Sequence, residues 1–273
     1  MMTTRTNRPF FLLLLFLIST TFFSGFLSDF LSGDAHADTH ALPEFTAKYA
    51  IQKFGIKLAE THYQLSYTNT GYKFSQNTKL HGVARMLRRD TVSAVSYIDK
   101  ISGNLLLTKH NYKQTGREKN KDEDFDISWN TRKNILHGKI TGIVRNKNIS
   151  LRTNSEIWEA LSFQIPLMIE ANETIKEYTY KAILKGEINN YNFVLTDSKK
   201  ITFADKEYKA LQLIRKDPER DRQLHIWLIP ALYNIPVIIE NYRDGKEHSR
   251  AQLESVNFNH EKLYDDTDND DDF

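Results

Sequence analysis

Alternation of apolar and polar residues constrains the fold of this chain more than any other feature of its sequence. The alternation recurs in Phe45–Ile51, Tyr63–Tyr67, Tyr178–Leu184 and Leu224–Leu228. A period of two is typical of strands whose sheet has one covered face and one wetter face. Turn residues separate these segments, and Asp244-Gly245 is the strongest hairpin signal. We therefore predict a mainly β fold, in which roughly a dozen strands form a curved antiparallel meander sheet, a half-barrel or an open barrel.

One segment departs from this period. Ser155 to Glu170 reads SEIWEALSFQIPLMIE, and its apolar residues recur at helical spacing. We expect Asn154 or Ser155 to cap the first turn and Pro166 to kink or end the helix. The prediction is one main helix of three turns, packed on the curved sheet so that it closes an open face. A second short segment, Val83–Arg89, is compatible with a helix or a loop.

The N-terminal segment has the three parts of a secretory signal peptide. Arg5 and Arg8 precede the apolar run Phe10–Ile18, and the small-residue site Ala35-His36-Ala37 follows. We expect cleavage after Ala37 and a periplasmic location. The alternative is that the segment stays uncleaved and anchors the protein in the inner membrane.

The chain contains no cysteine, which excludes disulfides, thiol catalysis and cysteine-based metal sites. An exported chain without disulfides fits a bacterial envelope better than a eukaryotic secretory route. We predict a signal peptide over 1–37, a single β-rich domain over 38–260 and a disordered acidic tail over 261–273.

Motifs of known enzymes and metal sites are missing from the sequence. It contains no G-x-S-x-G, no glycine-rich phosphate loop and no H-E-x-x-H. His225 is interpreted as a hydrogen-bonded core or rim residue, and the acidic run Asp122–Asp126 is split between two strand faces. We predict no catalytic residue, no metal, no cofactor and no nucleic-acid partner.

A small amphipathic patch is a candidate for peripheral membrane contact. Its cations flank two apolar residues in the order Arg85, Met86, Leu87, Arg88 and Arg89. Such a patch is able to touch anionic lipid, and a solvated surface turn is the alternative interpretation.

The C-terminal third carries a family resemblance. Between Lys206 and Phe258 the chain contains Ile226-Trp227-Leu228, then Ile235-Pro236-Val237 and the Asp244-Gly245 hairpin. This pattern resembles the exported bacterial family called domain of unknown function 3108, and the similarity extends over most of Phe45–Phe258. The resemblance implies no settled activity. It implies an exported protein whose curved antiparallel sheet is similar to the half-barrels of lipoprotein-localisation carriers, which hold acyl chains against a concave face.

Three functions remain open at this point. The first is a non-enzymatic envelope protein that binds or carries a lipid or other amphiphile in the concave face. The second is an assembly or scaffold protein that binds another envelope protein through a strand edge. The third is an enzyme acting on polysaccharide through carboxylates such as Glu177, Glu187 and Glu240. For the first function, the candidate ligand-binding residues are Tyr49, Tyr63, Trp158, Phe163, Phe193 and Trp227.

Overall fold

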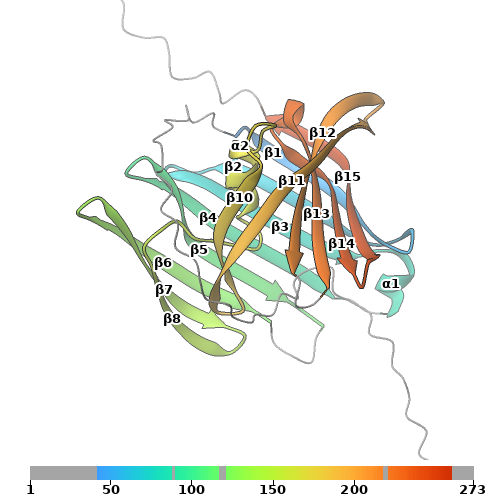
Figure 1. Cartoon of the computed structure of the whole chain (residues 1–273). Helices are drawn as coiled ribbons and strands as arrows, with labels where there is room; N and C mark the ends of the chain where they lie inside the picture. The colour runs from blue at the N-terminus through green and yellow to red at the C-terminus, as the bar shows by residue number, and fades with distance from the viewer. Residues whose placement is uncertain (1–41, 88–89, 117–120, 218–220, 260–273) are drawn as a thin grey trace, which may run out of the picture.

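The protein folds into one curved, 15-stranded sheet (Figure 1). The computed structural model describes residues 42–87, 90–116, 121–217 and 221–259. The strand order is β8-β7-β6-β5-β4-β3-β2-β1-β15-β14-β13-β12-β11-β10-β9. The elements are β1 (Glu44–Lys53), β2 (Ile56–Tyr67), β3 (Gly71–Leu80), α1 (Gly82–Leu87), β4 (Thr91–Ile101), β5 (Asn104–Gln114), β6 (Glu123–Arg132), β7 (Ile135–Val144), β8 (Lys147–Thr153), β9 (Trp158–Glu159), α2 (Gln164–Glu170), β10 (Glu177–Leu184), β11 (Glu187–Phe203), β12 (Lys206–Asp217), β13 (Arg222–Ile229), the 3-10 helix η2 (Pro230–Leu232), β14 (Ile235–Arg243) and β15 (Lys246–Asn259).

Tight turns join most neighbouring strands. Between β14 and β15, Asp244 has φ 50° and Gly245 has φ 70°. Positive φ at both central residues is what a two-residue hairpin turn with the twist of its strands requires. Arg243 pairs with Lys246 across this turn, which confirms the predicted Asp-Gly hairpin.

Strand β1 joins the two halves of the chain. Phe45 pairs with Leu65 of β2 on one side and with Phe258 of β15 on the other. Ala47 and Tyr49 follow Phe45 at intervals of two, and all three side chains are buried on the concave side. The predicted alternation is therefore confirmed, and its apolar set faces the inside of the curve.

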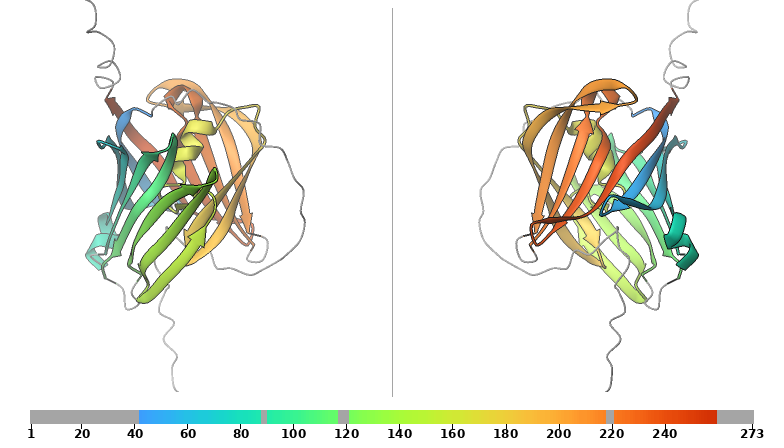
Figure 2. Two further views of the ribbon diagram at one scale, coloured as in Figure 1. Left: turned by 90° about the vertical axis from the view of Figure 1, so that its left-hand side faces the viewer. Right: turned by 90° about the vertical axis from the view of Figure 1, so that its right-hand side faces the viewer.

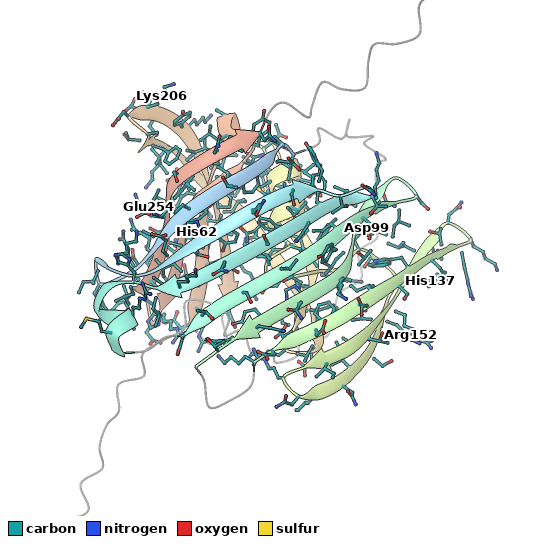
Figure 3. All side chains as sticks on the ribbon, turned by 180° about the vertical axis from the view of Figure 1, so that it is seen from behind. His62, Asp99, His137, Arg152, Lys206 and Glu254 are labelled. Atoms are coloured by element: carbon teal, nitrogen blue, oxygen red, sulfur yellow. The ribbon has the colours of Figure 1, made fainter. Side chains whose placement is uncertain are left out.

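The outer face of the same strands is polar (Figure 3). Lys57 Nζ lies 2.6 Å from Glu254 Oε1, and Lys48 Nζ lies 2.9 Å from Glu60 Oε2. The hydrogen bond from Lys48, together with those from His62 and Lys57, lowers the pKa of Glu60 to about 2. This network keeps the convex face in water and leaves the concave face as the place for apolar contacts.

The sheet curls without closing into a barrel (Figure 2), as predicted. It has fifteen strands rather than a dozen, because some strands lack a clear apolar period. In β7, Gly138 lies opposite Trp129 and Gly142 lies opposite Phe125. A Cβ on Gly138 would meet the indole at 2.6 Å, so the aromatic ring of β6 occupies the space of the missing side chain. A strand built in this way shows no alternation of its own.

The predicted three-turn helix is wrong in its extent. Residues 158–159 form β9, a turn follows, and α2 begins only at Gln164. Neither Asn154 nor Ser155 caps the helix, since its N-cap is Phe163, which makes no side-chain cap hydrogen bond. Pro166 lies in the first turn, where its missing N–H removes no helical hydrogen bond, and so it does not end the helix.

The second short segment is helical over Gly82–Leu87, which forms α1. Within the part of the chain that the structure describes, no helix has the length and apolar character needed to cross a membrane. The predicted signal peptide over 1–37 and the predicted acidic tail over 261–273 lie outside the described residues.

Candidate ligand-binding site

A segment of the chain enters the concavity of the sheet and fills part of it. We call residues 155–171 the strap. Trp158 and Glu159 of the strap pair in parallel with Ala182 and Ile183 of β10, and α2 follows between the two walls of the sheet (Figure 2). The strap thus covers much of the apolar inner face, as the predicted helix was expected to do.

A buried carboxylate fixes the first half of the strap. Glu159 accepts hydrogen bonds from Ser96 Oγ at 2.6 Å, from the Leu161 N–H at 2.6 Å and from the Ser162 N–H at 2.7 Å. These two N–H groups would otherwise be left unpaired in the turn before α2. The charge of Glu159 therefore does the work that a helix cap was expected to do.

His110 completes this buried cluster. Its Nδ1 lies 3.0 Å from Ser96 Oγ and 3.5 Å from Glu159 Oε1. Burial lowers the pKa of His110. Ser, His and Glu in contact are the residue types of a hydrolytic triad, but the Ser96 hydroxyl donates to Glu159 and Ser96 is fully buried. The cluster holds the strap on the sheet.

The other half of the strap is held by an amide and by ring stacking. Asn234 Nδ2 donates to the carbonyl oxygens of Met168 and Ala171, at 2.9 Å each. Phe163 stacks on Tyr191 and on Phe193, with 5.5 Å between ring centroids in both pairs. The two β11 rings are two positions apart on one strand face, so one strap ring covers both.

The strap leaves a cavity of about 150 Å³ between itself and strands β11–β15 and β1–β3. Its deeper wall is mainly apolar and includes Ile51, Tyr63, Phe163, Ile226, Ile239 and Ala251. The buried polar residues Thr61, Gln76 and Gln164 also line it. Its rim is formed by charged and polar residues from the ends of β12, β13, β14 and β15, namely Arg215, Asp217, Arg222, Arg243 and His248. The cavity is therefore apolar at one end and charged at the other.

The structure brings only part of the predicted set into this cavity. Tyr63 and Phe163 line it. Tyr49 does not line the cavity but packs edge-on against Tyr63, with 5.2 Å between the ring centroids. Its hydroxyl donates a hydrogen bond to the Pro236 carbonyl at 2.7 Å. Phe193 lies behind Phe163 in the ring stack.

Two predicted residues lie elsewhere. Trp158 is buried in β9 beside Ala182, away from the cavity wall. Trp227 adjoins Ile226, which lines the cavity, so its side chain lies on the opposite face of β13. There Lys199 Nζ lies 4.0 Å from its ring centre. A tryptophan between two aliphatic residues gives no signal of which face it takes.

The rim arginines were missed by sequence reasoning. Arg215 reaches the cavity because it pairs with Leu224, an inner-face residue of the next strand. The alternation around Leu224 predicted that inner face, but the register between β12 and β13 is not readable from the sequence.

Exposed apolar side chains gather near the rim. Met86 of α1 is 86% exposed, Phe54 of the β1–β2 turn 82% and Ile56 64%. Arg85 beside Met86 is also exposed. Of the predicted membrane patch, Arg88, Arg89 and the side chain of Leu87 lie outside what the structure describes.

The carboxylates considered for catalysis are not brought together. Glu177 and Glu187 lie at opposite ends of the β10–β11 hairpin, and Glu240 is ion-paired with Arg250 at 2.7 Å. Among the described residues no group of three or more acidic, histidine or cysteine residues has a metal-binding arrangement. His225 is largely buried in β13, hydrogen-bonded to Gln223 and stacked on Tyr242, in agreement with the predicted hydrogen-bonded histidine.

Comparison with known proteins agrees with this architecture. The family described as "Protein of unknown function (DUF3108)" matches residues 44–268. The chain belongs to this family. Its fold is similar to that of a β-barrel-like protein of domain of unknown function DUF1849 from Brucella abortus, solved by crystallography. The TM-score is 0.53 and the identity 8%, over 80% of this chain and 99% of that one. No curated protein matches the chain.

Proposed function

We propose that this DUF3108 protein is an exported envelope protein that binds or carries an amphiphile in the concave face of its sheet, without catalysing a reaction. The observation that carries the proposal is the cavity with an apolar inner wall and a charged rim at one end. Ligand pockets are typically concave, largely apolar and equipped with a few converging polar groups. The predicted signal peptide over 1–37 supports a periplasmic location, with an inner-membrane anchor as the alternative.

The volume of the cavity limits what part of the ligand is buried. About 150 Å³ is comparable to engineered apolar cavities that take up benzene. A ring or a short alkyl segment fits inside, and the rest of a longer ligand would extend past the rim. The bound part is therefore small, in contrast to the acyl chains held by the lipoprotein-localisation carriers, whose half-barrel shape the family resemblance led us to expect.

The exposed residues near the rim support contact with a membrane surface. Phe54, Ile56 and Met86 are apolar, and Lys53 and Arg85 beside them are cationic, a combination typical of interfacial binding to anionic lipid. Lys53, next to Phe54, lies near His248 of the cavity rim. Burial, then the nearby charges of Arg243 and Lys53, lower the pKa of His248. The β1–β2 turn is therefore close to the rim. We propose that an amphiphile passes between membrane and cavity at this end.

Binding of another envelope protein through a strand edge has weaker support. Among the described strands, β8 pairs with β7 alone and is one border of the sheet. It is seven residues long and carries Lys147 and Arg152, and short, charged edge strands are the usual protection against strand addition. A polysaccharide-acting enzyme is supported less, because the three carboxylates considered for it do not converge.

Native mass spectrometry tests the proposal. The protein is isolated from the envelope without detergent and compared with an Ala160→Leu variant, in which the new side chain points into the cavity that Ala160 lines. We expect an additional mass on the wild type that is lost on organic extraction and reduced in the variant. Thr131→Leu, at an exposed position of β6, is the control. A bare wild-type mass would contradict the proposal.

A further inference from the structure

We propose that the cavity selects amphiphiles with an anionic head group, a phosphate or a carboxylate, and that Arg215 and Arg243 bind this group at the rim. The inference rests on the proposed function and adds the chemistry of the ligand's polar end.

The first support is the charge of the rim. Among the residues that the structure describes, three arginines line the cavity, Arg215, Arg222 and Arg243, together with one carboxylate, Asp217. Arg222 and Arg243 are directly opposite each other on β13 and β14. Arg222 is one of the causes that lower the pKa of Arg243, and like charges directly opposite each other destabilise a sheet, so an anion bound beside Arg243 is favoured.

The second support is the state of the Arg215 guanidinium. Its central carbon lies 4.3 Å from the centre of the Tyr191 ring. The guanidinium makes no hydrogen bond or ion pair with any residue that the structure describes. The ring occupies one face of the guanidinium, and its N–H edge is left for a ligand. A planar fork of donors held on a ring is well suited to bidentate binding of a carboxylate or phosphate.

The third support comes from the Arg243 guanidinium, which likewise makes no hydrogen bond or ion pair within the described part of the chain. Burial is the main cause that lowers the pKa of both Arg215 and Arg243. Partly buried cations without a hydrogen-bonded partner are unfavourable, and an anion between them compensates for the lost hydration.

The apolar wall lies next to these groups. Leu224 pairs with Arg215 across β12 and β13, and Ile226, two residues on, lines the deeper wall. A ligand whose anion lies against Arg215 therefore has its apolar part directed at Leu224 and Ile226. The two ends of the site match the two ends of a short-chain amphiphile.

Isothermal titration calorimetry of the purified protein tests the inference with four probes: hexyl phosphate, hexanoate, 1-hexanol and inorganic phosphate. We expect at least one of the two anionic amphiphiles to bind about tenfold or more tightly than 1-hexanol, the range that one charge-assisted hydrogen bond supplies. Which of the two binds tighter distinguishes a phosphate from a carboxylate head group.

Variants locate the effect. Arg215→Gln and Arg243→Gln are each expected to weaken binding of the anionic probe about tenfold while leaving 1-hexanol unchanged. Arg152→Gln, on the exposed edge strand β8 (Figure 3), is the matched control and is expected to bind as the wild type does. Because Arg215 also packs on Tyr191, the rim variant Arg243→Gln keeps the test valid if Arg215→Gln folds poorly.

The outcomes separate the inference from the function beneath it. Equal binding of 1-hexanol and the anionic probes, unchanged in both arginine variants, would overturn the inference and leave amphiphile binding intact. Binding of inorganic phosphate as tight as that of hexyl phosphate would also overturn it, because the apolar wall would then contribute nothing. Failure of hexyl phosphate, hexanoate and 1-hexanol alike would contradict the proposed function itself.

Discussion

The Ser96 hydroxyl of β4 donates a 2.6 Å hydrogen bond to the Glu159 carboxylate of the strap, across 63 positions of sequence. This bond joins the segment that fills the concavity to the wall that it covers. The same carboxylate also accepts two backbone N–H groups of the strap. The position of the strap beside the cavity therefore depends on the hydrogen bonds of one buried side chain.

Replacing Glu159 by Gln is expected to destabilise the protein by about 2–4 kcal/mol. Both carboxylate oxygens accept hydrogen bonds, whereas an amide has one accepting oxygen and an NH₂ group that donates, so at least one buried donor loses its acceptor. Urea denaturation measures the free energy of unfolding. The control is Glu207→Gln, an exposed partner of Lys200, which is expected to change stability by less than about 1 kcal/mol. Similar losses in both variants would show that Glu159 does not anchor the strap.

Phe163→Ala removes the ring that stacks on Tyr191 and Phe193. We expect a loss of about 3–5 kcal/mol, typical of a large aromatic side chain removed from a core. The folded fraction of this variant has a larger cavity. Its binding preference, measured by calorimetry, should therefore shift from hexyl phosphate towards octyl phosphate. Phe54→Ala, at a position 82% exposed, is the control and should change neither quantity. An unchanged chain-length preference in Phe163→Ala would place the ligand elsewhere.

Glu123 predicts a specific dependence of stability on pH. Burial raises its pKa to about 7 from an ordinary value of 4.5, and this effect outweighs the attraction of Arg145 at 3.6 Å. The folded state therefore holds the proton more tightly than the unfolded state. The stabilisation is complete below about pH 4.5 and is lost as the pH rises through about 7, by up to roughly 3 kcal/mol.

Chemical denaturation of wild type and Glu123→Gln between pH 4 and pH 8 checks this. The free energy of unfolding of the variant should fall less steeply across that window than that of the wild type. Parallel profiles for the two proteins would contradict the assignment.

The exposed apolar side chains near the rim, Phe54, Ile56 and Met86, predict that the protein binds membranes. Phe54→Ser and Met86→Ser are each expected to weaken sedimentation with phosphatidylglycerol vesicles about tenfold, the effect of losing burial of one large apolar side chain. Ile143→Ser removes a residue that is 52% exposed on β7 and serves as the control. If the wild type bound neutral phosphatidylcholine vesicles equally strongly, this would contradict the proposal that Lys53 and Arg85 attract the protein to anionic lipid.

The fold was largely predictable because its information is local. The alternation in Phe45–Ile51 and the Asp244-Gly245 pair predicted strands and a hairpin that the structure contains. The strap was mispredicted as a three-turn helix because its first turn is replaced by bonds to Glu159, and those depend on Ser96 far away in sequence.

The site was less predictable because it depends on register. Tyr63 and Phe163 were found as large aromatic residues of an inner face. Arg215 was not, since its position in the cavity follows from the pairing of β12 with β13 and from the ring of Tyr191 on β11. Trp227 shows the converse, an aromatic residue whose strand face the sequence leaves open.

Solution NMR with labelled protein and hexyl phosphate tests the central claim most directly, because it locates the ligand. Binding in the cavity predicts saturable shifts at Ile51, Ile226 and Ala251, together with a shift of the Arg215 side-chain N–H resonances. Shifts confined to the convex face, around residues such as His62 and Glu254, would contradict it.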